Sequence, residues 1–109
     1  MRWFITKLVF NIADSGAVER QFEEQWRMVA AEDRKHAFKK ALDLGAKEAE
    51  EIIRDDGSAV KWEFIAVTDM IEFNPDSDGA EVHSSIASPE EPENYLRFVQ
   101  QKAACIPLN

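Results

Sequence analysis

Residues 59–73, Ala-Val-Lys-Trp-Glu-Phe-Ile-Ala-Val-Thr-Asp-Met-Ile-Glu-Phe, decide the fold, because they form the clearest strand pattern in the chain. Side chains alternate between the two faces of a strand, and here both sets are apolar. One face would carry Val60, Trp62, Phe64, Ala66 and Met70, and the other would carry Ile65, Val67, Ile71 and Phe73. A strand that is apolar on both faces is expected in the middle of a sheet.

Three further segments have strand patterns. Residues 3–12 are rich in aromatic and β-branched side chains on both faces, which predicts a second central strand. Residues 19–30 alternate apolar with charged or amide side chains, which is typical of a strand at a sheet edge. A turn at 74–79 leads to residues 80–87, whose weaker alternation predicts the last strand.

A helical period begins at Glu32, with apolar side chains spaced by three and four as far as Ile53. Asp33 is a suitable N-cap, and Asp56-Gly57 is expected to end the helix. Gly45 lies on the apolar stripe, so it either lets the helix approach the sheet closely or marks a break in the helix.

A second helix is expected near the end of the chain. It would begin after Ser88 or after Glu91, and Pro92 favours the later start because proline suits a first helical turn. Its apolar side would carry Tyr95, Leu96, Phe98, Val99 and Ala103.

These elements predict an α+β fold in the order β-β-α-β-β-α. Placing the two strands with two apolar faces in the centre gives a four-stranded antiparallel sheet of strand order 2-1-3-4, with the helices packed on one face. At 109 residues the whole chain, 1–109, is expected to be a single α+β domain.

Composition limits the classes of partner. The formal net charge is −8, from 21 acidic and 13 basic residues, which disfavours nucleic acid and anionic membranes. No apolar run approaches the roughly 18 residues that a membrane span requires. Cys105 is the single cysteine, so no disulfide can form within the chain, and a cytoplasmic location is expected.

The sequence contains no convincing catalytic or metal motif. Asn74-x-Asp76-x-Asp78-Gly79 matches the start of a calcium loop, but Ser85 stands where the loop needs a bidentate Glu. His83 precedes two serines, yet there is no Gly-x-Ser-x-Gly nucleophile elbow. We therefore predict no catalytic residue, no metal ligand and no cofactor, and favour a non-catalytic protein over an enzyme.

The most informative feature is the apolar character of both faces of the central strands, because the two helices can cover only one face. We expect the other face to be rimmed by Glu23, Gln25, Arg27 and Lys61, and an apolar face with such a rim has the character of an interface. The sequence thus favours a protein-interaction module that forms a homodimer or binds another protein, through this face or an edge strand.

Two alternatives remain open. The first is a small-molecule binding domain or enzyme with a pocket between sheet and helices. The second is an immunity-type inhibitor that neutralises a basic toxin by charge complementarity. The candidate interaction or pocket residues are Trp3, Trp26, Trp62, Asp69 and His83.

A set of short motifs in a fixed order resembles a known family. They are Trp3-Phe4-Ile5-Thr6-Lys7-Leu8-Val9-Phe10, Phe22-Glu23-Glu24-Gln25, Ala31-Glu32-Asp33 with Ala37-Phe38-x-Lys40-Ala41, Leu44-Gly45, and Val60-x-Trp62-x-Phe64-x-x-Val67-x-Asp69. Over roughly residues 3–87 the chain is similar to the small bacterial proteins grouped as domain of unknown function 4288. The resemblance implies a bacterial, single-domain protein and assigns no activity, cofactor or site residue.

Overall fold

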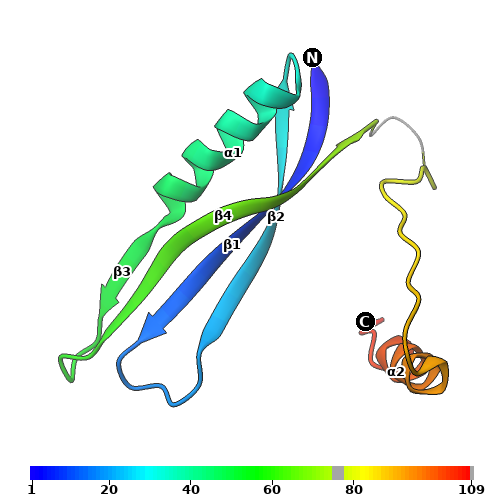
Figure 1. Ribbon diagram of the computed structural model, residues 1–109. Helices are drawn as coiled ribbons and strands as arrows, with labels where there is room; N and C mark the ends of the chain where they lie inside the picture. The colour runs from blue at the N-terminus through cyan, green and yellow to red at the C-terminus, as the bar shows by residue number, and fades with distance from the viewer. Residues whose placement is uncertain (75–77, 109) are drawn as a thin grey trace.

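The computed structural model describes residues 1–74 and 78–108 and has an α+β architecture (Figure 1). The elements in chain order are β1 (Arg2–Asp14), β2 (Gln21–Ala31), α1 (Arg34–Glu48), β3 (Glu50–Ile53), β4 (Ala59–Phe73) and α2 (Pro92–Ala104). All neighbouring strands pair antiparallel, in the order β2-β1-β4-β3. The prediction of two long central strands flanked by residues 19–30 at one edge is confirmed.

Helix α1 packs along one face of the sheet and forms the core with it. Ala37 and Ala41 face Phe4, Leu8 and Phe10 of β1, and all five side chains are fully buried. Thr6 is also fully buried on this face, and its hydroxyl donates to the carbonyl of Arg27 at 3.1 Å. The small residues of α1 allow the close approach that buries the large side chains of β1.

Gly45 is the point of closest approach between α1 and β4. A Cβ atom at this position would lie 2.3 Å from the Cε1 atom of the Phe64 ring, well inside van der Waals contact. The helix continues past Gly45 to Glu48, so of the two roles considered for this glycine, close approach is correct and a break is not. The N-cap prediction is confirmed, since the Asp33 carboxylate accepts from the His36 amide at 2.8 Å.

The predicted strand order 2-1-3-4 is wrong in its last strand. The outer strand is β3 at 50–53, whereas residues 80–87, which we expected to fill this place, form no strand. Ile52 and Ile53 continue the helical spacing of α1, which explains the error. Their β-branched side chains suit a strand better than a helix, and α1 ends before them.

The Asp56-Gly57 pair forms the hairpin turn between β3 and β4 instead of ending the helix. Gly57 has φ +87°, and the Arg54 amide donates to the Ser58 carbonyl at 2.8 Å. Arg54 also makes two hydrogen bonds of 2.8 Å to the Asp14 carboxylate. This bidentate pair fastens the hairpin to the end of β1.

Two irregularities in the pairing of β1 with β4 change which side chains of β4 face the helix. The register shifts between Lys7 and Leu8 and again between Val9 and Phe10, so Thr68 and Ile65 have no partner in β1. Each bulge moves the following side chains to the opposite face. As a result Val67 packs in the core under α1, although strict alternation predicted it on the other face from Phe64.

Helix α2 begins at Pro92, as the later of the two predicted starts required. It makes no contact with any other helix or strand in the described part of the chain, and none of its residues is buried. Figure 1 shows the chain leaving β4, running down beside the sheet and ending in α2 at a distance from it. Of the two helices expected on one face of the sheet, α1 contacts the sheet and α2 does not.

Candidate protein interface

The sheet has a second face, on the side away from α1, which we call the open face. Residues directly opposite one another in an antiparallel pair share a face, so the register defines it. Ile5 pairs with Met28 and Ile71, and Lys7 pairs with Trp26 and Asp69. By this register the open face carries Trp3, Ile5, Lys7, Val9, Asn11 and Ala13 of β1, Phe22, Glu24, Trp26, Met28 and Ala30 of β2, and Lys61, Glu63, Ala66, Asp69, Ile71 and Phe73 of β4.

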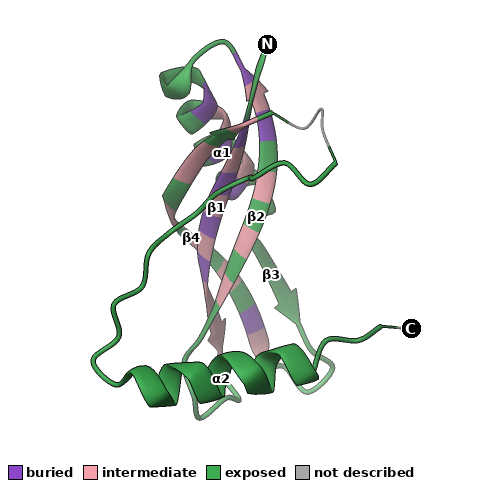
Figure 2. Ribbon diagram, turned by 90° about the vertical axis from the view of Figure 1, so that its right-hand side faces the viewer, coloured by how far each residue is buried: buried purple, intermediate pink, exposed green. Residues whose placement is uncertain are grey.

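Large apolar side chains of the open face are accessible to solvent. Phe22, Trp26 and Met28 on β2 are 52%, 54% and 56% exposed, respectively. Figure 2 looks toward this side of the sheet, with the chain beyond β4 crossing in front of it and α2 below. Contiguous apolar side chains at this exposure are characteristic of a surface that another molecule covers.

Glu23, Gln25 and Arg27 lie on the α1 side of the sheet, which corrects our expectation that they rim the open face, whereas Lys61, opposite Ala13, does lie on the open face. Arg27, Gln25 and Glu23 pair with Thr6, Leu8 and Phe10, whose side chains are buried under α1. They are linked to one another by hydrogen bonds, and Arg27 lies 3.5 Å from the Glu48 carboxylate at the end of α1. On the edge strand β2, Glu23, Gln25 and Arg27 therefore point to the α1 side of the sheet. Phe22, Trp26 and Met28 point to the open face.

Lys7 places one charge in the middle of the open face. Its ammonium lies 2.7 Å from the Glu24 carboxylate and 5.4 Å from the centre of the Trp26 ring. The hydrogen bond to Glu24 raises the pKa of Lys7, and the nearby Asp69 acts in the same direction. The ammonium is thus paired within the chain, and its stem lies among apolar neighbours.

A hollow of about 330 Å³ lies over the open face. Its lining is Ile5, Trp26, Ile71, Val82 and His83, so the segment after β4 contributes two of its walls. This hollow brings together two of the predicted residues, Trp26 and His83. Ile5, Ile71 and Val82 were not predicted, because their contribution depends on where residues 80–87 run once they do not form a strand.

The other three predicted residues are dispersed. Asp69 is exposed beside Lys7 and accepts from the Thr68 hydroxyl at 2.9 Å. Trp3 lies at the N-terminal end of β1 and is 39% exposed. Trp62 points to the α1 side, where it packs against the core cluster of Leu8, Phe10 and Ala41. The five residues therefore do not form one pocket between sheet and helices.

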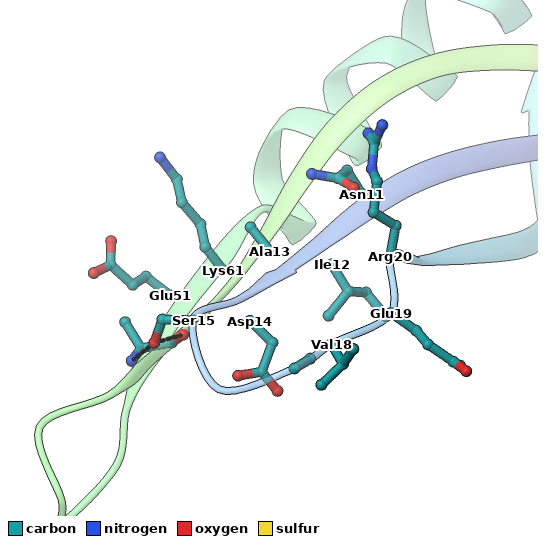
Figure 3. A pocket seen from close by; sticks show the side chains of 12 residues that line it. Asn11, Ile12, Ala13, Asp14, Ser15, Val18, Glu19, Arg20, Glu51 and Lys61 are labelled. Carbon is teal, nitrogen blue, oxygen red and sulfur yellow. Dashed lines mark hydrogen bonds between the residues drawn. The ribbon is translucent and has the colours of Figure 1, made fainter.

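A larger hollow, of about 510 Å³, lies at the turn between β1 and β2 (Figure 3). Asp14, Glu19, Arg20, Glu51 and Lys61 are among its lining residues. Their charged groups point in different directions, and the Asp14 carboxylate is already paired with Arg54. No set of groups converges there on a point where a reacting atom could sit.

Residues 1–74 and 78–108 offer neither a metal site nor a membrane-spanning helix. No group of three or more His, Cys, Asp and Glu side chains in that part of the chain could hold a metal ion, and Asp76 of the calcium-like motif lies outside it. No described helix has the length and apolar character needed to cross a membrane.

The residues that form the sheet also identify the family of this protein. Residues 3–84, from β1 through β4 to the start of the segment over the open face, match the family described as "Domain of unknown function (DUF4288)". The chain belongs to this family. The matched region of this DUF4288 protein ends before α2. No curated protein and no solved structure has a significant match to it.

Proposed function

We propose that this DUF4288 protein is a non-catalytic interaction module that forms a homodimer through its open face. The observation that carries the proposal is the row of half-exposed aromatic and sulfur-containing side chains on β2, Phe22, Trp26 and Met28, on the face opposite to the one where α1 packs. The row lies on a strand that is paired along its length with β1, so the surface is formed before a partner arrives.

The accessible area of the chain supports a second copy as the partner. The chain exposes 8,686 Å², whereas a compact monomer of 12.4 kDa exposes about 6,100 Å². The excess is about 2,500 Å² per chain, so a symmetric pair that covered it would bury about 5,000 Å². Interfaces of obligate homodimers extend over roughly 2,000–5,000 Å² and are more apolar than those of transient complexes.

The small core is a second reason for assembly. In the described residues only eight apolar side chains are buried, and two of those are alanines of α1. Apolar burial contributes about 25 cal/mol per Å², and it must offset a conformational entropy of about 1–2 kcal/mol for each ordered residue. A chain that leaves one face of its sheet uncovered gains little free energy from apolar burial. Association of two copies through that face would bury more apolar area and add to the stability.

The test compares two lysine substitutions on one strand. Met28→Lys places a charge on the open face, whereas Gln25→Lys places it on the α1 side of β2, where the native residue is already polar. Light scattering on a size-exclusion column should show a dimer for the native chain and for Gln25→Lys. The dimer of the Met28→Lys variant should dissociate into monomers at concentrations at least about tenfold higher than those at which the native dimer dissociates. A native monomer at every concentration would contradict the proposal.

The hollow over the open face supports a second candidate function, which is the binding of a small molecule. Its volume of about 330 Å³ is at the small end of the range for ligand sites, and Trp26 and His83 offer one stacking surface and one polar group. A monomer that keeps a small molecule in native mass spectrometry, and loses it on Trp26→Ala, would favour this function over the dimer.

A further inference from the structure

Helix α2 has the properties of a segment that requires a partner. Tyr95, Leu96, Phe98 and Val99 on one side of it are 45%, 51%, 56% and 43% exposed. Its opposite side carries Glu93, Arg97, Gln100 and Gln101. An isolated helix of 13 residues is only marginally stable in water, so most of its stability must come from packing of the apolar side.

The remainder of the same chain does not supply that packing. In the described residues no hydrogen bond or ion pair joins 80–108 to 1–73, and α2 contacts no other element. The radius of gyration is 18.0 Å, compared with about 13 Å for a compact domain of this length. The segment after β4 reaches the open face at Val82 and His83 and then leads away from the sheet (Figures 1 and 2).

We infer that α2 of each copy docks by its apolar side on the open face of the other copy, so that the homodimer is a reciprocal exchange of C-terminal helices. This inference rests on the proposed homodimer and names the segment that fills its interface. Exchange of an identical element between two copies is a low-cost route to a dimer, and two-fold symmetry makes each contact of the exchange twice.

The dimensions of the two surfaces agree with this exchange. Helix α2 is about 20 Å long, and β1, which runs through the middle of the open face, is about 43 Å long. The chain's own segment already occupies the end of the face near Ile5 and Ile71. The arriving helix would lie beside this segment, along the row formed by Phe22, Trp26 and Met28 on β2, whose side chains are about half exposed.

The inference is tested first by two substitutions in α2. Val99→Asp places a charge on the apolar side of the helix, and Gln101→Asp places the same charge on the polar side. Both residues are exposed, so neither change should affect the fold, which circular dichroism would check. Val99→Asp should weaken the dimer at least tenfold, and Gln101→Asp should leave it unchanged.

The second test mixes two defective chains. Chains with Met28→Lys have a damaged face and an intact helix, and chains with Val99→Asp have the reverse. In a reciprocal exchange the mixed dimer concentrates both defects in one interface and keeps the other interface intact. Native mass spectrometry, with a mass tag on one variant, should therefore detect the mixed dimer at concentrations where each variant alone is monomeric.

Three results would overturn the exchange in distinguishable ways. If Val99→Asp stays dimeric while Met28→Lys dissociates, the open face is an interface but α2 does not fill it. If both variants are monomeric and mixing restores nothing, α2 docks on the sheet of its own chain. If the native chain is monomeric at every concentration, the proposed homodimer fails together with the exchange.

Discussion

On β1, Phe4, Leu8 and Phe10 are fully buried under α1, whereas their neighbours Trp3, Ile5 and Val9 are only partly covered on the open face. Both sets are large and apolar, so composition does not distinguish the two faces. The difference is the presence of a helix with small residues on one side only. Strand β1 thus carries large apolar side chains on both faces, while the single chain buries only those on the α1 side.

The largest expected effect comes from truncating an apolar side chain to alanine on the α1 side of the sheet, compared with the same change on the open face. Leu8→Ala should lower the free energy of unfolding by about 2–5 kcal/mol, because it leaves a cavity in the core under α1. Chemical denaturation should give this loss at every protein concentration. Met28→Ala on the open face should mainly weaken dimerisation, because the Met28 side chain is 56% exposed in the single chain. An equal, concentration-independent loss for both variants would remove the distinction between the faces.

The next prediction concerns the contact that brings α1 close to the sheet. Helix propensity alone predicts that Gly45→Ala stabilises the protein by about 1 kcal/mol. The close approach of Phe64 predicts the opposite sign, since overpacking costs about 1–3 kcal/mol. Denaturation of Gly45→Ala should thus show a net loss, and adding Phe64→Leu should recover part of it. A gain in stability would mean that α1 can move away from the sheet at no cost.

A smaller effect is expected where α1 begins. Asp33→Ala removes the carboxylate that accepts from the His36 amide and should destabilise the protein by about 1 kcal/mol. Asp43→Ala, in the middle of the same helix, is the control and should show no loss, because alanine is the better helix former. Thermal denaturation of the two variants measures the difference. Equal melting temperatures would show that the cap does not contribute.

The smallest effect lies at the end of the sheet, outside both faces. The Arg54 guanidinium, and then the Gly16 amide, lower the pKa of Asp14 to about 2 from an ordinary value near 3.8. A carboxylate whose pKa is lower in the folded state stabilises the protein above pH 3.8 and loses that contribution as the pH falls toward 2.

Asp14→Asn should therefore flatten the dependence of the free energy of unfolding on pH between about 4 and 2. Urea denaturation across that interval provides the measurement. Above pH 4 the variant should be the less stable chain by a constant amount. An unchanged slope would indicate that Arg54 and Asp14 do not pair in solution.

Much of the fold could be predicted because local patterns and tertiary structure agree. The bounds of β4 match the predicted range of 59–73, and the Asp33 cap and the Pro92 start are both where short-range chemistry places them. Ile52 and Ile53 were misassigned because their spacing fits a helix and their side-chain type fits a strand. Only the hairpin turn and the pairing with β4 resolve that conflict.

The open face was expected from the apolar strands, but its detailed composition could not be predicted. The bulges at Ile65 and Thr68 exchange the faces of Ala66 and Val67, which lie between them, and an alternating pattern does not reveal this exchange. The inward turn of Glu23, Gln25 and Arg27 follows from the register of β2 on β1, which is a property of the pair of strands. The hollow could not be predicted because its lining includes Val82 and His83. The sequence pattern placed residues 80–87 in a strand that the structure does not contain.

The decisive measurement is native mass spectrometry of the unmodified chain over a dilution series. It should show a species of twice the 12.4 kDa chain mass that dissociates into single chains only on dilution. A bare 12.4 kDa species at the highest concentration at which the protein stays dissolved would contradict the proposed homodimer, and would mean that the open face is not an interface between copies of this chain.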